Sequence, residues 1–275
     1  MADMTGGTSE TRTLRGFAVI SASALSTQSG AAVGSLAFST MTPVGVVAVR
    51  QLVASLVLLP MTRPRLWQFT GSQWWPLALL ALFFAGMNTA LYAAVDRVGL
   101  GMAVTIEFLG PLAVALISGR RPRDAACAAL ALSGVVLLTQ PGPTSDVLGL
   151  SFAVIAAVCW AGYILTNRVV GRRLPGVQGT AVATALSACV TVPIAAVIVW
   201  QAQPPAQAFL FAAAAGILAT AVPYSLDLIV LRRISPVVFG LGMSMHPFFA
   251  ALIGLVALSE DLPLIAWAGI CLLYT

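Results

Sequence analysis

Long apolar stretches separated by short polar loops recur along the whole chain. A bilayer core about 30 Å thick needs roughly 20 mostly apolar residues in a helix that crosses it. Stretches of this kind occupy ten ranges: 16–38, 44–61, 74–95, 100–118, 124–139, 148–167, 177–200, 206–231, 236–258 and 262–275. The pattern therefore predicts an all-α integral membrane protein with ten transmembrane helices.

The two ends of this series differ from the rest. Residues 1–15 are expected to form a polar N-terminal tail. The stretch at 16–38 carries scattered Ser, Thr and Gln and precedes nine more, which favours an uncleaved first helix over a signal peptide. The tenth stretch stops at Thr275 after 14 residues. That is about 21 Å of helix, so we expect the last helix to be truncated.

Composition supports the membrane interpretation. The chain is 59% hydrophobic and 8% charged, with a mean hydropathy of +0.97. Soluble domains carry roughly 25% charged residues, so a water-soluble protein is excluded. The four cysteines lie inside apolar stretches without metal-ligand spacing, and we interpret them as packing residues: Cys127, Cys159, Cys189 and Cys271. No metal site is expected.

The basic residues indicate how the chain is oriented. All 14 are arginine. One stands inside an apolar stretch (Arg50), one in the odd-numbered loops (Arg97), and 12 in the N-terminal tail and alternate loops: Arg12, Arg15, Arg63, Arg65, Arg120, Arg121, Arg123, Arg168, Arg172, Arg173, Arg232 and Arg233. Positive residues are retained on the cytoplasmic side, so the N-terminus is expected there. The same bias explains the net charge of +5, and nucleic acid is not an expected partner.

The two halves of the chain resemble each other. The segment 110–117 aligns without a gap on 246–253, which places Pro111 over Pro247. Five helices per half would make the second repeat enter from the opposite side, so 16–140 and 147–275 are predicted to be inverted repeats. Inverted repeats build alternating-access transporters with a site near the midplane. Pro111 and Pro247 are then expected to be paired hinges, although a duplicated scaffold without transport activity stays open.

Several segments resemble one known family. The run 102–116, which contains Glu-Phe-Leu-Gly-Pro-Leu-Ala-Val-Ala-Leu, resembles the fourth helix of threonine and homoserine exporters. Similar matches occur at 86–88, 159–165, 222–227 and 243–245. These exporters form a branch of the EamA-domain drug/metabolite transporter superfamily. Two positions differ from the usual pattern of that branch, because His246 replaces a glutamate and Asp227 stands where a glutamate is common.

The resemblance implies a function. It implies a secondary transporter of a bacterial-type inner membrane that exports small amino acids, or related polar metabolites, by exchange with protons. Export of drugs or other hydrophobic compounds is one alternative, and a lipid flippase or a non-transporting membrane partner is another. Phosphate-binding loops and hydrolase motifs are missing from the sequence, so neither an enzyme nor a cofactor is expected. Expected partners are a small-molecule substrate, protons and the lipid bilayer, and a homodimer is left open.

Charged residues inside the apolar stretches are the first candidates for the site. Each costs roughly 3 kcal/mol to insert, so each is a functional candidate. Arg50 and Glu107 both lie about two helical turns from the expected outer face and form either a fixed ion pair or a site contested by substrate and protons. In the second case Arg50 meets a carboxylate and Glu107 an ammonium group. Pro111 also frees the carbonyl of Glu107, which favours a cation or proton site there.

Uncharged polar side chains extend this candidate site. They share helix faces and are expected either to line a polar cavity or to join helices by hydrogen bonds: Gln28; Asn88 and Tyr92; Trp160, Tyr163 and Asn167. His246, the only histidine, is either a buried packing residue or a group that changes charge near neutral pH. Asp227 is either an interfacial partner of Arg232 and Arg233 or part of an inner gate or a proton acceptor. The Gly30-x-x-x-Gly34 motif predicts close helix packing.

Overall fold

The computed structural model describes residues 6–118, 146–175, 177–223, 226 and 245–260. Every regular element in these ranges is a helix. Four of the helices are long and apolar enough to cross a membrane: α2 (Pro43–Thr62), α3 (Gly71–Val98), α7 (Val147–Arg173) and α8 (Gln178–Ala202). The expected all-α class is therefore confirmed for the described part of the chain.

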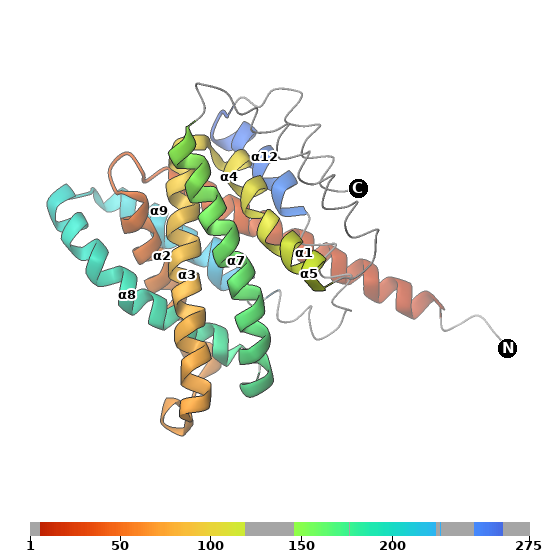
Figure 1. Cartoon of the computed structure of the whole chain (residues 1–275). Coiled ribbons are helices and arrows are strands. Elements are labelled where there is room, and N and C mark those ends of the chain that lie inside the picture. Colours follow the sequence, from red (N-terminus) through yellow and green to blue (C-terminus); the bar gives the residue numbers. More distant parts are fainter. Residues whose placement is uncertain (1–5, 119–145, 176, 224–225, 227–244, 261–275) are drawn as a thin grey trace.

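Helices α3 and α7 run antiparallel, side by side along the bundle (Figure 1). At one end, which we call the Arg97 end, Arg97 of α3 forms an ion pair with Asp146, just before α7. At the other, the Arg173 end, the Arg173 side chain donates to the carbonyl oxygen of Ser72 and lies over the Trp75 ring, 5.3 Å from its centroid. The two helices are thus tied at both ends.

Local sequence signals set where the long helices begin. Thr42 precedes α2, accepts a hydrogen bond from the Gly45 amide, and is followed by a proline in the first turn. Thr70 and Gln73 form a capping box at the start of α3. Asp146 caps α7 through the Gly149 amide. Each cap satisfies backbone donors that have no partner within their own helix.

Two of the expected helices are interrupted near the middle of the bundle. The stretch expected at 100–118 is divided into α4 (Leu100–Glu107) and α5 (Leu109–Ser118), with the break at Phe108. Pro111 accounts for the break, because a proline cannot donate to the carbonyl four residues earlier, here that of Glu107. The stretch expected at 206–231 begins as α9 (Ala206–Gly216) and continues as a π-helical turn, η2 (Ile217–Ala221).

Helices from the two halves of the chain pack together in matching pairs. α1 (Gly6–Ser35) contacts α12 (Met245–Ala257), and α4 contacts α7. The contact of α3 with α7 is matched by that of α1 with α9. The contact of α3 with α8 is matched by that of α2 with α9. α2 and α8 contact each other. Each of these contacts between the halves has a counterpart if α1, α2, α3 and α4 are matched with α7, α8, α9 and α12.

The two glycines of the Gly30-x-x-x-Gly34 motif confirm close packing of α1. A Cβ atom on Gly30 would lie 2.5 Å from the Ala219 amide nitrogen, and one on Gly34 would lie 2.9 Å from the Tyr92 hydroxyl. α1 therefore touches η2 through backbone atoms. It also begins at Gly6, upstream of residue 16, so the segment expected to be a polar tail is helical from that point.

Other expectations fall outside the described residues. These include the predicted helices at 124–139 and 262–275, with the expected truncation at Thr275, and the first part of the predicted helix 236–258. Asp227, Arg232 and Arg233 also lie there. α12 supplies the remainder of the ninth predicted helix.

Candidate functional site

A cavity of about 100 Å³ lies between the two halves of the chain. It is lined by parts of α1, α2, α3 and α4 from the first half and of α7, η2 and α12 from the second. The lining residues are Thr27, Gln28, Ala31, Arg50, Met87, Asn88, Leu91, Glu107, Trp160, Tyr163, Ala219, Pro223 and His246. Seven of the nine substrate-site candidates from the sequence are thereby brought together.

Five polar side chains of this cavity are almost completely buried. Gln28 and Asn88 are 3% exposed, Glu107 4%, Arg50 5% and His246 7%. Burying so many polar groups is unfavourable unless they find partners. Their partners are therefore informative about what the cavity can bind.

Arg50 is held by the second half of the chain. Its Nε donates to the Thr220 hydroxyl at 2.9 Å, and one terminal nitrogen donates to the Ala219 carbonyl at 3.2 Å. The guanidinium also lies over the Tyr92 ring, 5.1 Å from its centroid. An arginine carries five donors, so within the described part of the chain these contacts leave other guanidinium N–H groups without a partner.

The Ala219 carbonyl is available to Arg50 because of a proline. Pro223 follows four residues later and has no N–H group to donate to it. The neighbouring Leu218 carbonyl accepts a hydrogen bond from the Ser26 hydroxyl at 2.7 Å. Side chains of α1 and α2 thus satisfy carbonyls of η2. Short π-helical turns of this kind occur often at functional sites.

Unlike Arg50, Glu107 has no hydrogen-bonding partner among the described residues. Among the described residues, no hydrogen bond or ion pair is recorded for its carboxylate. The positive charge of Arg50 acts on it, yet the two described side chains do not form a direct ion pair. The sequence left open a fixed Arg50–Glu107 pair, and the structure shows Arg50 bonded to Thr220 and Ala219 instead.

His246 is joined to Gln28 on the facing helix. The Gln28 Nε2 and His246 Nδ1 atoms are 3.1 Å apart. The Trp160 ring meets the imidazole edge-on, with centroids 6.1 Å apart, and also meets Phe108 at 6.3 Å. His246 therefore has a fixed orientation at the cavity wall.

Asn88 and Tyr163 complete the polar lining. The Asn88 amide nitrogen donates to the Phe84 carbonyl of its own helix at 2.8 Å. This leaves the amide oxygen as an acceptor at the cavity. The Tyr163 ring packs against Phe84, with centroids 5.1 Å apart.

The other candidates lie outside the cavity lining. Tyr92 is fully buried behind Arg50, where its hydroxyl has no hydrogen-bond partner among the described residues. Asn167 is half-buried farther along α7. Pro111 and Pro247 belong to α5 and α12. The sequence did not single out Thr220 or Ala219, which hold Arg50.

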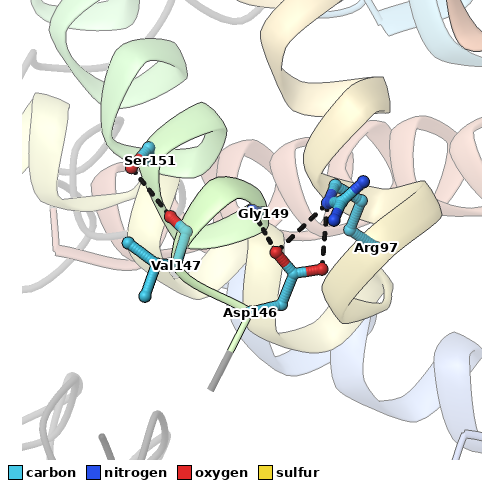
Figure 2. A network of polar contacts seen from close by, with 5 residues as sticks. All are labelled: Arg97, Asp146, Val147, Gly149 and Ser151. Atoms are coloured by element: carbon cyan, nitrogen blue, oxygen red, sulfur yellow. Dashed lines mark hydrogen bonds and ion pairs between the residues drawn. The ribbon is translucent and has the colours of Figure 1, made fainter. Parts of the chain in front are cut away.

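At the Arg97 end, two carboxylates connect helix ends, and Figure 2 shows the first of them, that of Asp146. Arg97 Nε lies 2.9 Å from one Asp146 oxygen and 3.1 Å from the other. The Gly149 amide donates to Asp146 at 2.9 Å. This backbone hydrogen bond, followed by the bond from Arg97, lowers the pKa of the Asp146 carboxyl below its ordinary value. The sequence singled out Arg97 only as the one arginine in the odd-numbered loops, and the structure shows its ion-pair partner.

The second of these carboxylates belongs to Glu260. Its oxygens accept hydrogen bonds from the amides of Leu100 at 2.6 Å and Gly101 at 3.2 Å. Gly99, with φ +82°, turns the chain into α4 at this point. A negative charge at a helix N-terminus is favoured by the helix dipole.

Comparison with known proteins assigns the chain to a family. Residues 147–275 match the EamA-like transporter family. The chain is 37% identical over 249 residues to the threonine/homoserine exporter RhtA of Salmonella typhimurium, with 90% of this chain and 84% of the relative covered. It is 36% identical over 240 residues to RhtA of Escherichia coli, with 86% and 81% covered. The chain belongs to the EamA-like transporter family.

The family assignment confirms the resemblance drawn from the sequence and makes this EamA-like transporter a membrane protein. Its fold also matches a crystal structure with a TM-score of 0.62, covering 95% of this chain and 94% of the other. At 21% identity, that match concerns the fold alone. The named relatives are exporters, and exporters are not enzymes.

Proposed function

We propose that this EamA-like transporter exports small amino acids of the threonine or homoserine type across a bacterial inner membrane in exchange for protons. The observation that carries the proposal is a shared cavity containing one buried guanidinium and one buried carboxylate that are not paired with each other. An amino acid has one group of each sign. Arg50 therefore meets the substrate carboxylate and Glu107 its ammonium group.

The size of the cavity supports a small polar substrate. At about 100 Å³, the cavity is smaller than the roughly 300–1,000 Å³ of pockets that hold drug-sized ligands. The relatives named above are exporters of threonine and homoserine, which is consistent with this size.

The packing of the two halves supports ten helices in two inverted repeats. Contacts that persist when the halves are exchanged, such as α1 with α12 and α4 with α7, are expected of a pseudo-twofold axis. The cavity lies between the halves, where rocking can open it to either side in turn. The breaks at Phe108 and η2 provide flexible points beside the cavity, and Pro111 and Pro247 are the paired hinges.

The arginines support a cytoplasmic N-terminus. Arg63 ends α2, and Arg172 and Arg173 end α7. Arg173 lies beside the start of α3, at the end of the bundle that we assign to the cytoplasm. Among the described residues, the arginine at the opposite end is Arg97, which pairs with Asp146.

Glu107 is the proposed proton carrier. A buried carboxylate that has no hydrogen-bond or ion-pair partner among the described residues can bind either a proton or an ammonium group, but not both together. Competition between the two at one site couples them in opposite directions. His246 and Asp227 are the other candidates for proton transfer.

The test is efflux of labelled threonine or homoserine from proteoliposomes under an imposed pH gradient. Wild-type protein is expected to show gradient-dependent flux, and Glu107→Gln is expected to lose the dependence on the gradient. Asp96→Asn, the same change at an exposed position of α3, is the matched control and should retain it. Absence of amino-acid flux in a folded wild-type preparation would refute the proposal and direct attention to hydrophobic compounds or lipids.

A further inference from the structure

The hydrogen bond between Gln28 and His246 leaves a defined pair of polar atoms at the cavity. It joins α1 to α12, residues 218 positions apart in the sequence. Among the described residues, no second hydrogen bond is recorded for either side chain. The remaining polar atoms are the Gln28 oxygen, one Gln28 N–H and His246 Nε2, and both residues line the cavity.

The chemistry of this pair does not depend on how the proton is placed. If the Gln28 amide donates to Nδ1, then Nε2 of the neutral imidazole carries a hydrogen and the Gln28 oxygen remains an acceptor. If the amide is turned over and its oxygen accepts from Nδ1, then Nε2 is an acceptor and the amide N–H groups are donors. Either arrangement presents one donor and one acceptor from adjacent side chains.

We propose that Gln28 and His246 together recognise a hydroxyl group on the substrate side chain. A hydroxyl is both a donor and an acceptor, so it matches this pair in either arrangement. A methyl group at the same place would leave two buried polar groups without partners, which disfavours apolar amino acids. This specificity role rests on the proposed export of amino acids, in which Arg50 and Glu107 hold the two charged groups.

Trp160 is the positioning residue for this pair. Its ring meets the His246 imidazole edge-on and is supported behind by Phe108. The contact limits rotation of the imidazole, so the free nitrogen keeps its direction. A fixed donor and acceptor discriminate better than mobile ones, because they cannot turn away to find other partners when the hydroxyl is missing.

Threonine and valine provide the sharpest test, since valine replaces the hydroxyl of threonine with a methyl group of similar size. Efflux of each is measured from proteoliposomes containing the whole chain. Wild type is expected to prefer threonine by roughly ten- to hundredfold. His246→Phe keeps an aromatic ring against Trp160 and should reduce this ratio to near one, mainly by slowing threonine. Gln28→Met, which removes the other partner, should reduce the ratio in the same way.

Thr105→Val is the matched control. It also replaces a buried polar group with an apolar one of similar size, but the Thr105 hydroxyl is bonded to the Gly101 carbonyl and lies outside the cavity lining. The threonine-to-valine ratio should not change in this variant.

The outcomes separate the inference from the proposed function. Equal transport of threonine and valine by wild type would overturn the hydroxyl-recognition role and leave amino-acid export standing. A threonine-to-valine ratio that stays at the wild-type value in both His246→Phe and Gln28→Met would also overturn the hydroxyl-recognition role. If only one of these variants folds, an unchanged ratio in that variant would overturn it. Transport of neither amino acid by folded wild type would overturn both.

Discussion

Arg97 and Asp146 connect the end of α3 to the start of α7 through a single carboxylate. Asp146 accepts from the Arg97 side chain, with its nearer oxygen 2.9 Å away, and from the Gly149 backbone at 2.9 Å. The carboxylate thus caps one helix and pairs with the last turn of its neighbour. It also gives a local reason for an arginine at this end of the bundle, where the charge pattern disfavours one.

This arrangement predicts a pH-dependent contribution to stability. The folded pKa of Asp146 is lowered, so its contribution is present above the ordinary value of about 3.9 and is lost as pH falls through the lower folded pKa. Asp146→Asn should lower the thermal midpoint of the purified protein at pH 7. The difference from wild type should shrink below pH 4. A difference that stays the same at pH 3 would contradict this, and Asp96→Asn serves as the control.

Gly30 and Gly171 should respond in opposite ways to alanine. At Gly30 the new Cβ would lie 2.5 Å from backbone of η2, so α1 must move away, at a cost of about 1–3 kcal/mol. At Gly171, in α7, nothing lies within 4 Å, and alanine should stabilise the helix by about 0.5–1 kcal/mol. Unfolding midpoints of the two variants in one detergent would check this. Equal effects would show that helix propensity, not contact with η2, decides the outcome.

Glu260 is expected to stabilise α4. Loss of a helix cap costs about 1 kcal/mol, and Glu260→Ala should destabilise the protein by that order. Glu260→Gln keeps an oxygen acceptor without the charge, so its stability should lie between that of Glu260→Ala and that of the wild type. Gly254→Ala should act through the same contact, because its Cβ would lie 2.5 Å from a Glu260 oxygen. The measurement is hydrogen exchange at the Leu100 and Gly101 amides. Unchanged protection there in all three variants would refute the role.

Tyr92 should contribute through its ring and not through its hydroxyl. The hydroxyl is buried without a recorded partner, so Tyr92→Phe should be neutral or slightly stabilising. Tyr92→Leu removes the ring under Arg50 and its edge contact with Phe38, at an expected cost of about 2–4 kcal/mol. Thermal unfolding of the two variants distinguishes them. A large loss in the phenylalanine variant would show that the hydroxyl has a partner after all.

Much of the site could be predicted because the bilayer makes polar residues informative. Arg50, Glu107 and His246 stand out in apolar stretches, and all three line the cavity. Tyr92 and Asn167 are not among the residues that line it. Helical spacing puts Tyr92 on one face with Asn88 but does not say that Arg50 will cover its ring, which depends on where α2 packs.

The partners of Arg50 could have been anticipated in part. The argument applied to Pro111, that a proline frees the carbonyl four residues earlier, applies equally to Pro223 and identifies Ala219. It does not identify which cation takes that carbonyl. The hydrogen bond from Arg50 to Ala219 spans 169 positions in the sequence and depends on tertiary packing. The sequence left open a direct Arg50–Glu107 ion pair, because the two opposite charges lie at similar depth, and these two described side chains do not form one.

The hydrogen bonds from Arg50 to η2 also have a consequence for membrane insertion and assembly of the chain. Arg50 enters the membrane with the second apolar stretch, while Ala219 and Thr220 are still to be translated. Until then the guanidinium lacks the acceptors that satisfy it, and a single unsatisfied arginine is expensive in lipid. The first five predicted helices should therefore remain loosely assembled after insertion and become compact only when η2 arrives. Biogenesis of this transporter is accordingly a late, whole-chain event, and a nascent chain stalled before residue 219 should be a target for membrane proteases.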